Sequence, residues 1–160
     1  MPQSQPVTYL PTHHLLPIAL KQLSAGAQLL VQSVREWVLS AQLGRSVGGD
    51  LLRAYSDHQC FHGLELFDYM MNVIARDAVR DVQVLHPDDQ TLGADELAVL
   101  RLIELTKRDS SRHAQRIASR MVRTRSQQLC AAARAYREEL ESAGLTLSGW
   151  SELRLVKKER

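Results

Sequence analysis

The sequence predicts an all-α protein, an elongated helical bundle of three long helices and one short helix. Apolar residues recur with helical period over most of the 160-residue chain. Aromatic residues make up only 5%, and the 8 glycines and 5 prolines are too few for a strand-rich fold with many turns. The length fits one domain, which we expect at 15–147, between an extended tail (1–14) and a C-terminal tail (148–160) with room for one short helix.

The first long helix is expected at 15–43 and is unusual in its low charge. Its apolar face contains Leu16, Leu20, Leu23, Ala27, Leu30, Val34, Trp37 and Ala41. Only Lys21, Arg35 and Glu36 are charged in this range. Interface cores are depleted in charge, so this helix is expected to join two copies in a homodimer. The alternative is a central helix that its own chain covers on all sides.

The remaining elements follow the same periodicity and its interruptions. They are long helices at 50–80 and 112–143, a short helix at 94–107, and a short irregular or extended connection at 82–92. Asp50 is placed to cap the second helix, because its carboxylate can accept from the free amides of the first turn. Gly144 is a natural stop for the last helix.

Two histidines and a carboxylate recur along one side of the helix predicted at 50–80. His58, His62 and Glu65 fall within roughly 60° of one another on a helical wheel. Two His and one carboxylate form a common ligand set for zinc and non-haem iron, so these residues are a candidate Zn or Fe site. Glu65 lies almost two turns from His58, so the site needs a further ligand such as His86 or His113. The alternative is structural, with both histidines hydrogen bonded to neighbouring acids or backbone.

Basic residues are concentrated around the start of the last helix. Residues 107–137 hold nine basic residues against one acidic residue, a net of +8, whereas 81–106 hold one against six, a net of −5. Five arginines, which we call the arginine ridge, lie within roughly 120° of the helix surface. They are Arg108, Arg112, Arg116, Arg120 and Arg123.

The arginine ridge has three explanations. A row of guanidinium groups suits an acidic protein partner or a phosphate backbone. Nucleic acid is the less favoured of these two, since no aromatic side chain is interleaved to stack on bases. The third explanation is that the acidic segment 81–106 folds back and pairs with the ridge.

The sequence carries no motif for enzymatic chemistry. It lacks G-x-S-x-G, a Gly-rich phosphate loop and H-E-x-x-H. No apolar stretch is long enough for a membrane helix, and two cysteines fit a reducing compartment. We therefore expect a bacterial, non-enzymatic cytoplasmic adaptor or regulatory protein that acts through protein–protein contacts, without a cofactor. The alternatives are a metal-binding helical-bundle enzyme or sensor, and a nucleic-acid-binding protein that uses the arginine ridge.

Overall fold

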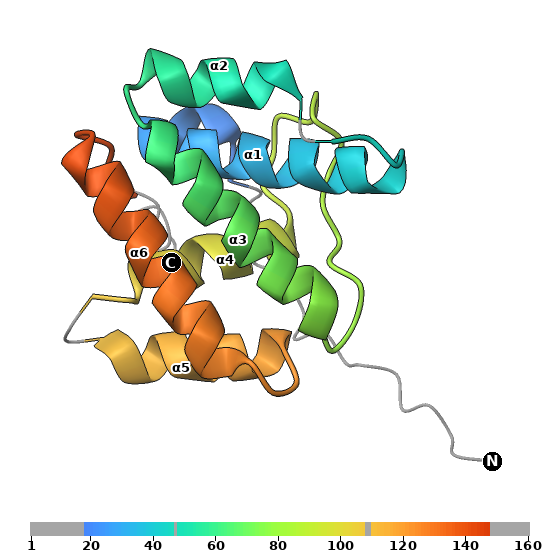
Figure 1. Cartoon of the computed structure of the whole chain (residues 1–160), viewed down its shortest axis with the longest axis vertical. Coiled ribbons are helices and arrows are strands. Elements are labelled where there is room, and N and C mark those ends of the chain that lie inside the picture. The colour runs from blue at the N-terminus through green and yellow to red at the C-terminus, as the bar shows by residue number, and fades with distance from the viewer. Residues whose placement is uncertain (1–17, 47, 108–109, 148–160) are drawn as a thin grey trace, which may run out of the picture.

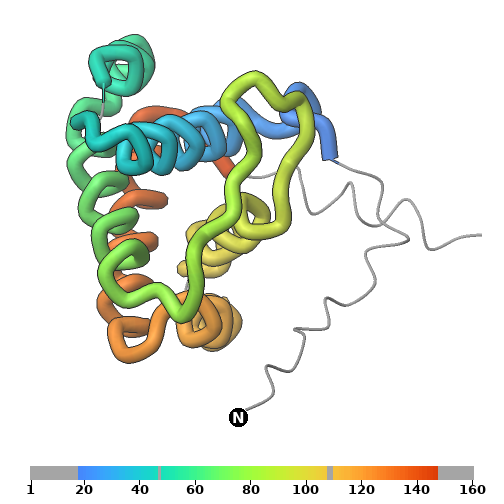
Figure 2. The backbone as a smooth tube through the Cα atoms, turned by 90° about the vertical axis from the view of Figure 1, so that its right-hand side faces the viewer, coloured from blue at the N-terminus to red at the C-terminus, as the bar shows by residue number. Residues whose placement is uncertain are grey.

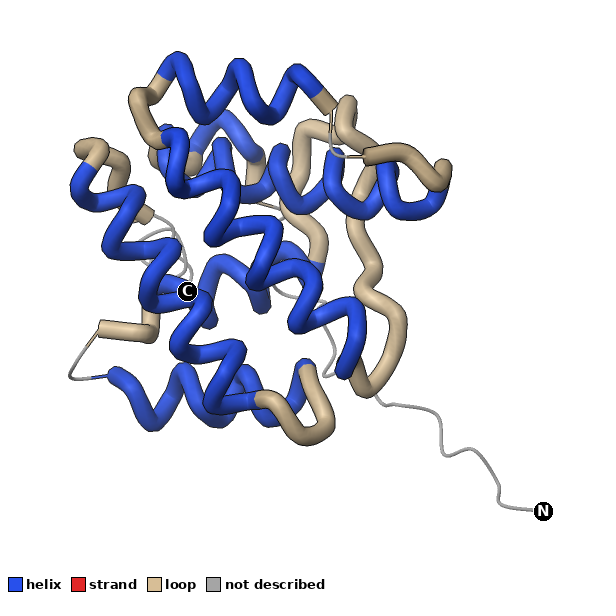
Figure 3. Tube along the Cα trace, in the orientation of Figure 1, coloured by secondary structure: helices blue, strands red, loops and turns tan. Residues whose placement is uncertain are grey.

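The chain is all-α, as predicted (Figures 1 and 3). The computed structural model describes residues 18–46, 48–107 and 110–147, and these contain helices but no strand. The elements are a short 3-10 helix η1 (Leu20–Gln22), α1 (Ala25–Gln42), α2 (Gly49–Asp57), α3 (Phe61–Asp77), α4 (Ala94–Glu104), α5 (Ser111–Met121) and α6 (Ser126–Ser142). None of these helices is long and apolar enough to cross a membrane. The predicted tails at 1–14 and 148–160 lie outside the described residues.

The helices cross one another around a single apolar core. α1 and α2 lie at one end of the molecule and α5 at the other, with α3 and α6 packed together between them (Figure 1). α4 lies behind this pair and contacts α1, α5 and α6. The largest buried apolar side chains include Leu30, Tyr55, Phe67, Met70, Leu100, Leu102, Leu129 and Tyr136. The non-helical connection from α3 to α4 runs along the outside of the fold, past α4 to α1 (Figure 2).

The helix expected at 15–43 begins later, at Ala25. Ser24 caps it, because its hydroxyl oxygen accepts from the backbone N–H of Ala27 at 3.3 Å. Most side chains between Gly26 and Arg35 are buried by the chain itself. The low charge of α1 is thus explained without a second copy, and the homodimer stays a prediction.

The single helix predicted at 50–80 is two helices in the structure. Gln59 separates them with a φ of 55°, in the left-handed region where a right-handed helix cannot continue. Cys60 then turns into the core, and its N–H donates to the carbonyl of Tyr55 at 2.8 Å. Gly63 allows this turn, because a Cβ there would lie 2.6 Å from the Cys60 Sγ.

The helix predicted at 112–143 also divides, into α5 and α6. The N–H of Arg123 donates to the backbone carbonyl of Asp77, the last residue of α3, at 2.9 Å. The Asp77 carboxylate accepts from the backbone N–H groups of Thr124 and Arg125, both at 2.8 Å. A carboxylate from a different helix therefore fixes the turn that leads into α6. With these two breaks, the predicted arrangement of three long helices and one short helix is replaced by shorter, crossing helices.

The hydrogen bonds that Asp77 accepts from this turn make the stability of the fold depend on pH. Its hydrogen bond from the Thr124 N–H is the main cause that lowers the pKa of Asp77; lost hydration raises that pKa by less, and the Arg125 N–H lowers it further. Because the pKa of Asp77 is lower in the folded than in the unfolded state, its ionised carboxylate stabilises the fold at pH values above the unfolded-state pKa of about 3.9. This contribution is lost as the pH falls through the folded-state pKa.

We expect Asp77→Asn to lower the free energy of unfolding at neutral pH and to flatten its decline between about pH 5 and pH 3. The matched control is Asp57→Asn, since Asp57 is exposed at the end of α2 and makes no side-chain hydrogen bond within the described residues. Urea denaturation at a series of pH values measures both effects. Equal pH slopes for the wild type and Asp77→Asn would contradict the prediction.

Candidate partner-binding surface

The three residues predicted to bind a metal do not share one helix. His58 follows the last residue of α2, whereas His62 and Glu65 lie in the first turns of α3. The His62 Nδ1 lies 3.0 Å from the Glu65 Oε2, with side chains 61% and 78% exposed. Within the described ranges, no group of three His, Cys, Asp or Glu side chains is arranged to hold a metal ion. The Zn or Fe site has no geometric support and stays a prediction from sequence.

The arginine ridge lies on and just beyond α5. Its exposed members are Arg112, Arg116, Arg120 and Arg123. Arg108 lies outside the described residues. The opposite face of α5 is anchored to the core by Ala114 and Ala118, which are both buried. The structure therefore leaves four ridge arginines in contact with solvent.

Three carboxylates of the acidic segment 81–106 are bound away from the ridge. Asp89 accepts from Thr91, Asp95 pairs with Arg80, and Glu96 pairs with Arg35. In the part of the chain that the structure describes, no ion pair joins a carboxylate to any of the four exposed ridge arginines. For these four arginines the described residues therefore show no self-pairing, whereas Arg108 lies outside them.

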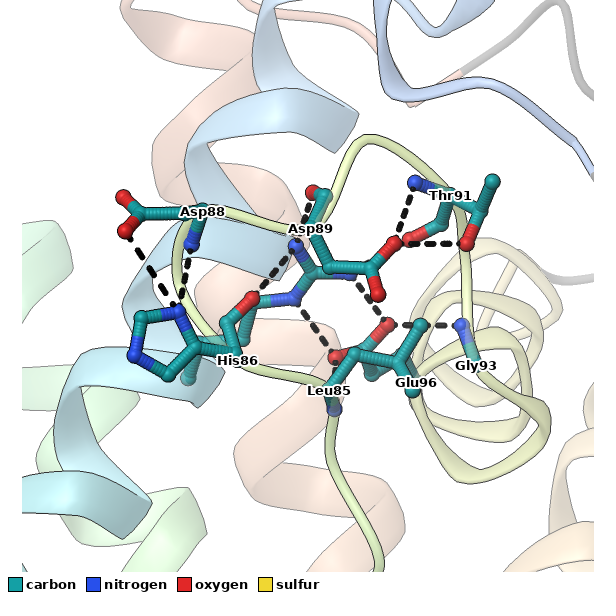
Figure 4. A network of polar contacts seen from close by, with 8 residues as sticks. Leu85, His86, Asp88, Asp89, Thr91, Gly93 and Glu96 are labelled. Carbon is teal, nitrogen blue, oxygen red and sulfur yellow. Dashed lines mark hydrogen bonds and ion pairs between the residues drawn. The ribbon is translucent and has the colours of Figure 1, made fainter.

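A buried ion pair, the Arg35–Glu96 clamp, holds the connection between α3 and α4 (Figure 4). Both side chains are fully buried and are joined by two hydrogen bonds, Nε to Oε1 at 2.7 Å and Nη2 to Oε2 at 2.9 Å. Arg35 also donates to the backbone carbonyls of His86, Asp89 and Thr91. Glu96 accepts from the backbone N–H groups of Leu85 and Gly93. Both buried charges are therefore hydrogen bonded, as burial requires.

One wall of a groove beside the ridge belongs to this same connection. The α4–α5 groove has a volume of about 260 Å³ and lies between α4, α5 and residues 79–82. Its apolar lining residues include Val79, Val82, Leu97, Ala98, Ile117 and Met121. Three arginines also line it, namely Arg80, Arg101 and Arg120. Because Arg120 belongs to both, the ridge reaches the edge of the groove.

A larger groove of about 690 Å³ lies between α1, α3 and the same connection. Arg35 and Asp81 are the residues with formal charge in its lining. All the guanidinium nitrogens of Arg35 are already engaged by Glu96 and by backbone carbonyls. Arg35 therefore stabilises the fold and has no remaining donor for a ligand in this groove.

Neither the clamp nor the groove was found by sequence analysis. In the sequence, Arg35 is one of few charges in the first predicted helix, and Glu96 is one of the six acids of the segment 81–106. The two residues are 61 positions apart in the sequence, and a local sequence pattern cannot indicate a contact at that separation. One signal was present: a charged residue that falls within an otherwise buried helical stretch requires a buried counter-charge.

Comparisons with protein-family models, with curated proteins and with solved structures found no match to this chain. The charge and the geometry of its own residues therefore carry the functional argument. In the described part of the chain, the exposed ridge and the adjoining groove place unpaired charge next to apolar surface that is open to solvent.

Removing one partner of the clamp tests whether it holds the fold together. We expect Glu96→Gln to lower the free energy of unfolding by about 3–5 kcal/mol, because it leaves the Arg35 charge buried and uncompensated. The matched control is Asp95→Asn in the same turn of α4. Its partner Arg80 has a side chain that is 47% exposed and keeps contact with water, so we expect a smaller loss than for Glu96→Gln. Urea denaturation measures both. A Glu96→Gln variant as stable as Asp95→Asn would show that the clamp is not a determinant of stability.

Proposed function

We propose that this protein is a non-enzymatic adaptor or regulatory protein that binds an acidic protein partner through the arginine ridge. The observation that carries the proposal is the row of exposed arginines with no carboxylate partner in the described residues. A row of positive charges without nearby carboxylates attracts a negatively charged partner and increases its association rate. Guanidinium groups also form bidentate hydrogen bonds with carboxylates, which the ammonium group of lysine does not form.

The spacing of the ridge suits side chains of another protein. Three ridge residues follow one another at four-residue intervals on α5, namely Arg112, Arg116 and Arg120. The distance from the first to the last is about 12 Å along the helix axis. Acidic side chains at the same interval on a partner helix would lie opposite them.

A protein partner is favoured over nucleic acid by what surrounds the ridge. α5 itself carries no Phe, Tyr or Trp, the side chains that form the large stacking platforms of single-strand binders. The neighbouring α4–α5 groove is lined largely by apolar residues. A phosphate backbone presents no apolar group to such a surface, whereas a protein does.

Charge reversal on the ridge tests the proposal. A fluorescein-labelled oligoglutamate peptide is the probe, and fluorescence anisotropy measures its Kd. We expect Arg112→Glu/Arg116→Glu to weaken binding about tenfold or more and to reduce its salt dependence between about 50 mM and 200 mM.

The matched control is Arg45→Glu/Arg53→Glu. It changes the net charge equally, but at the opposite end of the molecule, on and beside α2 (Figure 1). We expect this variant to bind within about twofold of the wild type. Equal losses in the two variants would mean that net charge and not the ridge is responsible. A DNA duplex of matched charge that bound more tightly than the peptide would replace the protein partner with nucleic acid.

A further inference from the structure

We infer that the α4–α5 groove receives an apolar side chain of the acidic partner, so that the surface recognises a segment in which an apolar residue stands beside carboxylates. This inference rests on the proposed function and specifies the chemistry of its partner. Three properties of the groove support it: its size, its exposed apolar lining and its position at the end of the arginine ridge.

The groove has the size of a side-chain site. Its volume of about 260 Å³ is below the range of roughly 300–1,000 Å³ in which sites for drug-sized ligands and cofactors fall. One or two apolar side chains of a peptide suit it better than a cofactor does. A partner segment would place such a side chain in the groove while its backbone stayed outside.

The apolar lining of the groove is left open to solvent. Val79 is 43% exposed although it is a large aliphatic residue. Leu97, Ile117 and Met121 are half-buried, with one side packed against the core and the other facing the groove. Adjacent apolar residues that remain exposed and are rimmed by charges are typical of contact sites for other proteins. Covering them with an apolar side chain would be favourable.

The charge at the edge of the groove suits a carboxylate beside the inserted side chain. Arg120 is three residues after Ile117 on α5, so the two are neighbours on the helix surface. The acid in the lining, Asp95, is held by Arg80 through two hydrogen bonds of 2.7 and 2.8 Å. This ion pair prevents Asp95 from repelling an acidic partner.

The arrangement has the anatomy of a binding hot spot. An apolar anchor at the centre is excluded from water, and charged groups at the rim set orientation and partner choice. The two features would therefore respond differently to salt. The arginine ridge would attract the partner's carboxylates over a long range, and salt would weaken this attraction. The groove would bury the partner's apolar side chain, and salt would leave this contribution intact.

The test compares two labelled peptides of equal charge, a glutamate-rich peptide with a central Leu and the same peptide with Ser in its place. We expect the Leu peptide to bind the wild-type chain about tenfold or more tightly than the Ser peptide. Ala98→Leu fills the groove from α4 and is expected to abolish this preference without changing the Kd of the Ser peptide. Ala131→Leu is the matched control, because Ala131 is exposed on α6 and does not line the groove.

The ridge variant Arg112→Glu/Arg116→Glu separates the two proposals. If it weakens both peptides while Leu and Ser bind equally, the inference about the groove is overturned and the proposed function stands. If neither peptide binds the wild type, both are overturned. Should Ala98→Leu perturb folding, as far-UV circular dichroism would show, Val79→Ser removes the exposed wall of the groove instead. A Leu preference that survives in the folded groove variant would place the apolar contact elsewhere and overturn the inference.

Discussion

The charge of Arg35 is buried between α1 and the connection that leads to α4, and the surrounding chain has to satisfy it. A buried guanidinium is tolerated only when its donors are paired. Here the partners are one carboxylate from α4 and three backbone carbonyls of the connection. A segment without helix or strand has few hydrogen bonds within itself, so its path depends on contacts with other elements. Arg35 supplies three of these contacts, and the backbone bonds from Leu20 to Gln90 and from Leu92 to Ile18 add to them. Fixing the path also fixes α4 against α1.

The surface features depend on the same connection at its other end. The connection starts directly after Asp77, whose carboxylate holds the turn between α5 and α6. The N–H of Val79 donates to the carbonyl of Met121 at the end of α5, at 3.0 Å. Backbone contacts thus join the helix that carries the ridge to the segment that forms the wall of the groove. The core clamp and the proposed binding surface are consequently the two ends of one restrained segment.

Local periodicity sufficed for the helical class, for the face of α1 that packs inward and for the non-helical stretch around Pro87. It also placed the ridge arginines opposite the apolar face of their helix, since a helix sorts residues by angle alone. It failed at Gln59 and after Val122, because those breaks have tertiary causes. One depends on the burial of Cys60 against a glycine, and the other on a carboxylate 47 positions away. The metal hypothesis depended on an unbroken helix and lost its geometric basis at the first of these breaks.

The ridge adds a local cost to the helix that carries it. α5 has 11 residues; its fully buried residues are two alanines, and Ile117 and Met121 pack half-buried against the core. Like charges four residues apart on a helix are destabilising by about 0.2–0.5 kcal/mol per pair, and Arg112 also stands in the first turn, where the helix dipole disfavours a cation. Arg120 stands in the last turn, where the dipole favours a cation, so the cost comes from the repulsion and from Arg112. An acidic partner would remove the repulsion, so its binding and the stability of α5 would be linked. Repulsion between the ridge arginines lowers the stability of α5, and binding of an acidic partner would remove it. Such a loss of stability is expected at a site that has been selected for function.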